Sequence, residues 1–264
     1  MSFVVEDLDG RLRAALAGAV AGERRAGIPT GAGQLLDAAE SAAAHDGFDA
    51  SDLTQRGLDA LPPAGIAALP LRALAYGLLT PADRPNLRRS AHRSARLAGA
   101  DAGTAMTAVA AAVLVADLLR FDLDWCLARL HQTLLEEAPQ ALLDRLRPLP
   151  DHLGMRGDQD PGAALQIAIT ALSRAGTVPE VLDELDAYGE NLTVAYSLAG
   201  ALAGASGGTA GGDTTWLDGL SPRADAVAAH LAERARALID RRTTVSLSQS
   251  PGSTAIESPR HDRN

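Results

Sequence analysis

Aromatic residues make up only 3% of the 264 residues, and there is a single cysteine, Cys126. One cysteine excludes an intramolecular disulfide and suits a reducing compartment. Because Cys126 lies in an apolar stretch, we expect a buried structural thiol and not a nucleophile. A chain with little Ile, Phe or Tyr but much Ala and Leu favours helices over sheets. The expected fold class is therefore all-α.

An excess of positive charge is also missing, since 24 Lys and Arg stand against 33 Asp and Glu, for a net charge of −9. Phosphate neutralisation needs a basic patch, so we expect no nucleic-acid partner. The apolar run at 195–205 is shorter than the roughly 20 residues that span a bilayer, so no membrane partner is expected. The N-terminus lacks the basic-then-apolar pattern of a signal peptide, and a cytoplasmic protein is expected.

Small residues are concentrated in one stretch, 189–205, which reads GENLTVAYSLAGALAGA. A helix that is apolar on all sides must be buried. Gly200 and Gly204 each weaken an isolated helix by about 1 kcal/mol relative to Ala. We therefore interpret them as points where neighbouring helices approach closely, and we expect this stretch to form the central helix of the domain.

Apolar spacing predicts further helices along the chain, at 8–22, 64–79, 86–98, 102–120, 123–137, 139–147, 163–174, 179–188 and 222–242. Asp7 or Asp9 is expected to cap the first of them. Pro70 is expected to kink or begin a helix. Residues 243–264 are rich in Ser, Thr and Pro and are predicted to be a disordered tail, which leaves 8–242 as a single domain.

Two polar clusters leave alternatives open. Asp158 and Asp160 lie two apart in a Gly-rich loop, where a solvated turn is favoured over a calcium site. The basic residues of 86–98 favour one solvated helix face, although they could instead meet an acidic partner or a phosphate; they are Arg88, Arg89, Arg93 and Arg96.

Several segments match one known pattern in chain order. The stretch RLRAALAGAVAGE at 11–23, the turn Gly47-Phe48-Asp49, the pair Pro70-Leu71 and the GALAGA helix at 200–205 all follow it. Together, over about 8–241, they resemble the ADP-ribosylglycohydrolase family, of the type that activates dinitrogenase reductase. The resemblance implies a single orthogonal multi-helix domain with all-α architecture.

The same resemblance implies a magnesium-dependent hydrolase of ADP-ribosyl bonds, with two ions held by Asp carboxylates and Thr hydroxyls of two motifs. In the first motif, Thr-Asp-Asp-Thr-Gln-Met, Thr30 and Gln34 match the two ends. Gly31, Ala32 and Gly33 stand in place of Asp, Asp and Thr. The first motif therefore supplies no carboxylate.

The second motif, Gly-Gly-Asp-x-Asp-Thr, is degenerate as well. Glu190, Asn191 and Thr193 fall within it, but no paired Asp remains. A helix N-terminus explains Glu190 and Asn191 better than metal binding does. Weak candidates for relocated ligands are Glu190 itself, Glu23, Asp101 and Asp213. The family's substrate-facing Asn and Arg fall on Pro63 and Ala67, so no catalytic or ligand-binding residue is predicted.

Three functional hypotheses follow. The preferred one is a pseudoenzyme that has lost its magnesium ligands, needs no cofactor, and binds an ADP-ribose-like ligand or a protein partner. The alternative is an active ADP-ribosyl hydrolase with relocated ligands. The third is a structural helical protein that acts only through interaction.

Overall fold

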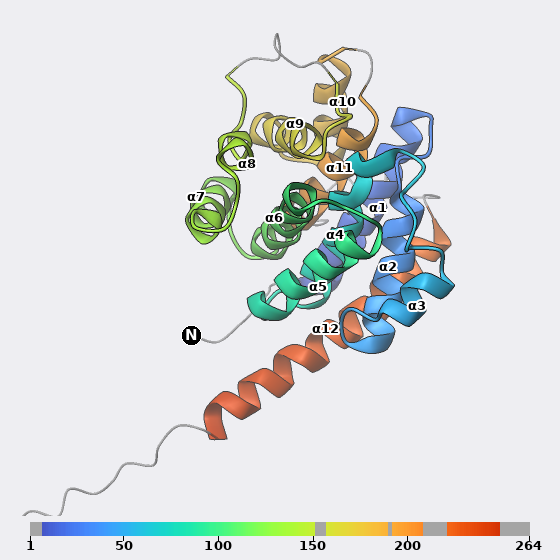
Figure 1. Ribbon diagram of the computed structural model, residues 1–264, viewed down its shortest axis with the longest axis vertical. Coiled ribbons are helices and arrows are strands. Elements are labelled where there is room, and N and C mark those ends of the chain that lie inside the picture. Colours follow the sequence, from blue (N-terminus) through green and yellow to red (C-terminus); the bar gives the residue numbers. More distant parts are fainter. Residues whose placement is uncertain (1–6, 151–156, 190–191, 208–220, 249–264) are drawn as a thin grey trace, which may run out of the picture.

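The computed structural model describes residues 7–150, 157–189, 192–207 and 221–248, with side chains up to 242. Within these ranges the secondary structure is helical and contains no strand, which confirms the all-α prediction (Figure 1). The elements are α1 (Leu8–Ala26), α2 (Ala32–His45), α3 (Ala50–Gln55), the 3-10 helix η1 (Gly65–Ala68), α4 (Leu69–Leu79), α5 (Arg84–Leu97), α6 (Ala102–Leu118), α7 (Leu123–Leu134), α8 (Gln140–Arg145), α9 (Pro161–Arg174), α10 (Val178–Asp186), α11 (Val194–Gly207) and α12 (Pro222–Ser248).

Helices α1 and α11 form the centre of the fold and touch through their backbones. A Cβ atom added to Gly18 would lie 2.1 Å from the carbonyl oxygen of Gly200, and one added to Gly200 would lie 2.2 Å from that of Gly18. One turn further along, a Cβ atom on Gly204 would lie 2.2 Å from the carbonyl oxygen of Ala14, so the two helices are antiparallel. The predicted role of Gly200 and Gly204 as packing points is confirmed.

A second buried pair, α4 and α6, packs beside the first. Every residue of α4 is buried, and so is most of α6. Gly77 allows the close approach here, since a Cβ atom on it would lie 2.1 Å from the carbonyl oxygen of Ala112. Helices α5 and α7 cover α6. Among the described residues, no helix is both long enough and apolar enough to cross a bilayer.

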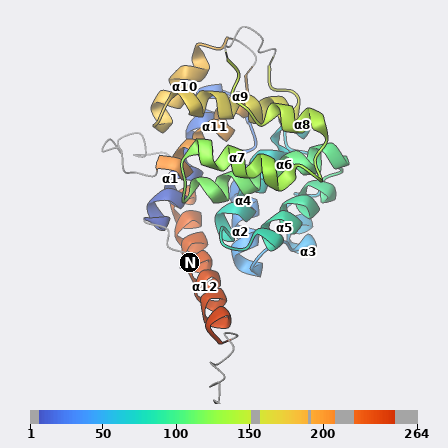
Figure 2. The ribbon, with the colours of Figure 1, turned by 90° about the vertical axis from the view of Figure 1, so that its left-hand side faces the viewer.

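Helix α12 packs on α1 and α2 through Val227, Leu231 and Ala235, and its far end extends away from the other helices (Figures 1 and 2). It continues to Ser248, six residues past the predicted end at 242. The first part of the predicted tail is therefore helical, and 249–264 lies outside the described residues.

The ends of other helices follow local signals in the sequence. Asp7 caps α1 by accepting the N–H of Gly10 at 3.1 Å. The helix runs to Ala26, four residues past the prediction, because the chain reverses at Gly27, whose φ of 70° suits glycine. Pro70 lies in the first turn of α4, so it begins a helix and does not kink one. The break expected between the helices at 123–137 and 139–147 is present, and Pro139 lies in it, directly before α8.

Candidate functional site

The first motif lies where the last turns of α1, the start of α2 and the start of α11 meet. Glu23 comes from α1, Thr30 and Gly31 lead into α2, and Ser197 lies in the first turn of α11. The segment before α4 covers this point, since a Cβ atom on Gly31 would contact Ala68 at 3.3 Å. The fold thus brings the sequence-predicted Glu23 and Thr30 together with Ser197, which the sequence did not single out.

The carboxylate of Glu23 caps the N-terminus of α2. Its Oε2 atom accepts the N–H groups of Thr30, Gly31 and Ala32 at 2.7, 3.0 and 3.1 Å. The Thr30 hydroxyl lies 3.0 Å from the same oxygen. A helix N-terminus carries unpaired N–H groups and a partial positive charge, so it stabilises a carboxylate in this place.

Two hydroxyl groups continue the network into the core. Thr30 Oγ1 and Ser197 Oγ are 2.5 Å apart, and either can donate. Ser197 Oγ also lies 2.9 Å from the carbonyl oxygen of Ala19 in α1. Both residues have no exposed surface. Thr30, the one hydroxyl kept from the first motif, is therefore bound to protein groups on each side.

The replaced positions of the first motif have no side chain that could hold a cation. Gly31 precedes α2 with φ of 108°, a backbone conformation that residues with a Cβ atom rarely adopt. Ala32 is buried, and Gly33 is exposed at the start of α2. A residue with a Cβ atom at position 31 would therefore be strained in this backbone conformation.

The start of α11 is also capped by a carboxylate, which corrects the interpretation of Asp158 as part of a solvated turn. Asp158 has no exposed surface, and its Oδ2 atom accepts the N–H groups of Thr193 and Ala195 at 2.6 and 2.7 Å. Its Oδ1 atom is buried without a hydrogen-bond partner among the described residues. Thr193 thus contributes a backbone donor at this point. Glu190 and Asn191 lie outside the described residues.

The other polar residues that the sequence singled out either cap helices, are buried in the core, or lie outside the described residues. Asp101 caps α6 by accepting the N–H of Thr104 at 2.7 Å, and this hydrogen bond lowers the pKa of its carboxyl group. Asp160 likewise caps α9, through the N–H of Ala163 at 3.0 Å. Asp213 lies outside the described residues. Burial raises the pKa of Cys126 to about 12, as befits a structural thiol.

An ion-pair network joins the last turn of α1 to α10 and α11. Arg25 of α1 donates to Asp186 of α10, and Nη2 of Arg25 also donates to Asp183 at 2.8 Å. The Tyr196 hydroxyl donates to the second oxygen of Asp186 at 2.7 Å. The hydrogen bond from Arg25 lowers the pKa of Asp186. Burial, followed by the hydrogen bond to Asp186, raises the pKa of Tyr196 to about 12. These contacts tie α1, α10 and α11 together beside Glu23.

The described residues at this site do not fit a pair of magnesium ions. Magnesium needs several oxygen ligands, carboxylates above all. The carboxylate oxygen that faces the start of α2, Oε2 of Glu23, already has four protein donors around it. Among all described residues, no three His, Cys, Asp or Glu side chains are grouped so that they could hold a metal ion.

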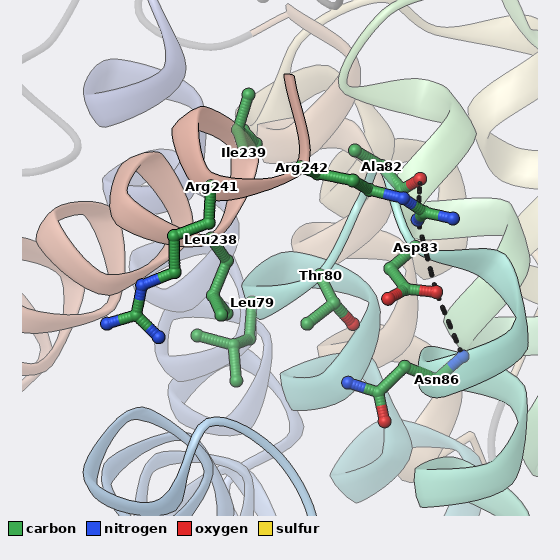
Figure 3. Close-up of a pocket in the computed structure, with 9 residues that line it drawn as sticks. All are labelled: Leu79, Thr80, Ala82, Asp83, Asn86, Leu238, Ile239, Arg241 and Arg242. Atoms are coloured by element: carbon green, nitrogen blue, oxygen red, sulfur yellow. Dashed lines mark hydrogen bonds and ion pairs between the residues drawn. The ribbon is translucent and has the colours of Figure 1, made fainter. Parts of the chain in front are cut away.

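A surface pocket of about 270 Å³ lies elsewhere, between α12 and the corner that joins α4 to α5. Figure 3 shows Arg242 of α12 reaching Ala82 and Asp83, with its Nη1 atom 2.6 Å from the Ala82 carbonyl oxygen. Leu79 of α4 and Leu238 of α12 supply apolar surface to this pocket. None of its lining residues belongs to either motif.

Neither a protein-family model nor a curated protein matches this sequence. Among solved structures, one described as an ADP-ribosylglycohydrolase-related protein complex is similar, with a TM-score of 0.71 and 20% sequence identity. The match covers 87% of this chain and 99% of that one. At this level of identity the likeness concerns the three-dimensional arrangement. The chain therefore has the all-α fold of an ADP-ribosylglycohydrolase-related protein.

Proposed function

We propose that this protein is a catalytically inactive relative of the ADP-ribosylglycohydrolases, which acts by binding an ADP-ribose-like ligand or a protein partner. The observation that carries the proposal is the position of Glu23. Its carboxylate fills the N-terminus of α2, where the resemblance places the first group of metal ligands, and four protein donors surround one of its oxygens.

The surroundings of Glu23 support this proposal. Thr30 is held by Glu23 and Ser197, and Gly31 adopts a conformation that does not suit an Asp. At the start of α11, backbone N–H groups are likewise occupied by Asp158. A carboxylate oxygen of the protein itself thus accepts backbone N–H groups at the start of α2 and at the start of α11. Of the candidates for relocated ligands, Asp101 serves as the cap of α6 and is thereby engaged by the backbone.

The test is a calorimetric titration with ADP-ribose, with and without magnesium, beside an assay for release of ADP-ribose from a modified protein. We expect no hydrolysis and no effect of magnesium on binding. Saturable binding without magnesium would support a ligand-binding role. If ADP-ribose does not bind in either condition, the protein-partner form of the proposal remains, and a partner is then sought by cross-linking.

Magnesium-dependent release of ADP-ribose would overturn the proposal. The Glu23→Gln variant would show whether such an activity depends on the Glu23 site. Glu23→Gln keeps the length of the side chain and an acceptor oxygen but removes the charge. If the enzyme were active through Glu23, this variant would lose turnover while it remained folded.

A further inference from the structure

A separate surface pocket of about 330 Å³ lies between α5 and α7, with α6 packed against both helices. Its volume is at the lower end of the range for small-molecule sites. It shares no residue with the Glu23 site or with the pocket beside α12. The lining comes from Arg84, Pro85, Arg88, Arg89, His92, Met106, Val109, Thr133 and Glu137.

The pocket is positively charged in a protein of net charge −9. Three guanidinium groups and one carboxylate line it, and α5 itself contains no Asp or Glu. The sequence contains no lysine, so the cations of the chain are arginines, with histidines when protonated. A guanidinium group is a planar fork of five donors that suits phosphate and carboxylate oxygens. A local positive cluster of this kind attracts anions.

Two of the arginines are held in place by the protein. Arg84 donates to the Thr133 hydroxyl at 3.0 Å and forms an ion pair with Asp117, which is buried. Arg88 forms an ion pair with Glu137 across the pocket. These partners use only some of the five donors on each guanidinium, so both groups are fixed in position and can still donate.

An arginine and a histidine that line the pocket have no partner among the described residues. Arg89 is exposed and His92 is half-buried, and neither makes a hydrogen bond or an ion pair there. They lie three residues apart on α5 and therefore share one face of the helix. Met106 and Val109 of α6 also line the pocket and add apolar surface. The pocket thus combines unpaired hydrogen-bonding groups, one of them a guanidinium, with an apolar wall.

We propose that this pocket binds an organic phosphate. The phosphate group would meet Arg89, His92 and the remaining donors of Arg88, while the carbon skeleton would lie on Met106 and Val109. A phosphate is favoured over a carboxylate because its three terminal oxygens can accept from three side chains at once. The site contains no motif residue, and because ADP-ribose is itself an organic phosphate, Arg89→Gln and Glu23→Gln distinguish binding here from binding at the candidate site.

The experiment is a calorimetric titration with phenyl phosphate, inorganic phosphate and benzoate, at constant ionic strength. We expect phenyl phosphate to bind most tightly, because it alone offers both a phosphate and an apolar group. Arg89→Gln should weaken its binding about tenfold, the loss expected for one charge-assisted hydrogen bond. Glu23→Gln should leave this binding unchanged, which separates the pocket from the candidate site.

Arg93→Gln is the matched control. Arg93 is also exposed on α5 and carries the same charge, but it lies over the ring of Phe48, 4.4 Å from its centre, and does not line the pocket. The Arg93→Gln substitution should weaken the binding of phenyl phosphate less than twofold. Equal losses in the two variants would show general charge attraction and overturn the proposal. So would the absence of saturable phenyl phosphate binding, or equal affinities for phenyl phosphate and inorganic phosphate, or tighter binding of benzoate.

Discussion

The two parts of the α1–α11 helix pair are held together in different ways. Along the middle, Gly18 and Gly200 bring the backbones into contact, and no further atom fits between them. At the end near α2, Glu23, Thr30 and Ser197 join the helices through hydrogen bonds between side chains and backbone. Close packing of the two backbones holds the middle of the pair, whereas hydrogen bonds hold its end. Polar partners can be exchanged with less displacement of the helices than a close backbone contact allows, because they lie at the end of the pair.

The largest effect is expected in the middle of the pair. Gly200→Ala places a Cβ atom 2.2 Å from the backbone oxygen of Gly18, and backbone atoms can move apart only if the helices separate. We expect a loss of about 3 kcal/mol in the free energy of unfolding, at the upper end for overpacked cores. Chemical denaturation measures it.

Gly33→Ala is the matched control for this substitution. It makes the same chemical change in α2, at an exposed position where a new Cβ atom would meet no atom within 4 Å. We expect it to be neutral or to stabilise by up to about 1 kcal/mol, because Ala is the better helix former. If both variants shifted stability in the same direction, the close contact in the middle would not be the cause.

The start of α11 should be the next most sensitive place. Asp158→Ala removes a fully buried acceptor and leaves the N–H groups of Thr193 and Ala195 without their partner. We expect a loss of about 2–3 kcal/mol, measured by urea denaturation. Asp160→Ala removes an exposed cap on α9 and should cost about 1 kcal/mol. A smaller loss for Asp158→Ala than for Asp160→Ala would contradict the importance of burial.

Glu23→Ala tests the polar end itself. The carboxylate is only partly buried, so water can replace it at some of the N–H groups at the start of α2. We expect a loss of about 1–2 kcal/mol, as for other helix caps. If the proposed function holds, magnesium at millimolar concentration should leave the thermal midpoint of the natural protein unchanged, because only an ion that binds the folded state stabilises it. A rise in the midpoint that disappears in Glu23→Ala would indicate a metal site.

The smallest effect is expected from the ion pairs around Asp186. Its lowered pKa means that its contribution is present above the ordinary Asp value, about 3.9, and is lost as the pH falls through the lower value in the folded protein. Asp186→Asn should therefore cost less than about 1 kcal/mol at pH 7, since the group is partly exposed. The difference from the natural protein should shrink in acid, as urea denaturation at several pH values would show. A difference that stayed constant down to pH 2 would rule out the charge as its source.

The sequence was sufficient to predict most of the helices and their relation to a known fold. Apolar spacing identified α6 and α9, and Pro70 and Pro139 marked where helices begin, because these signals act within one or two turns of chain. The small residues of α11 indicated a buried helix for the same reason. The end of α12 was placed too early, because Ser and Thr near its end are compatible with either a helix or a tail.

What the tertiary structure decided is the partner of each polar group. Asp158 lies 35 residues from Thr193 in the sequence, and Thr30 lies 167 residues from Ser197. No local pattern reports such pairs, because they depend on where separate helices meet. The sequence alone determined that Gly31, Ala32 and Gly33 carry no carboxylate, since that needs only residue identity. Only the fold could show that Glu23 and Asp158 occupy the two helix starts, because a carboxylate caps whichever N–H groups the packing of the helices brings to it.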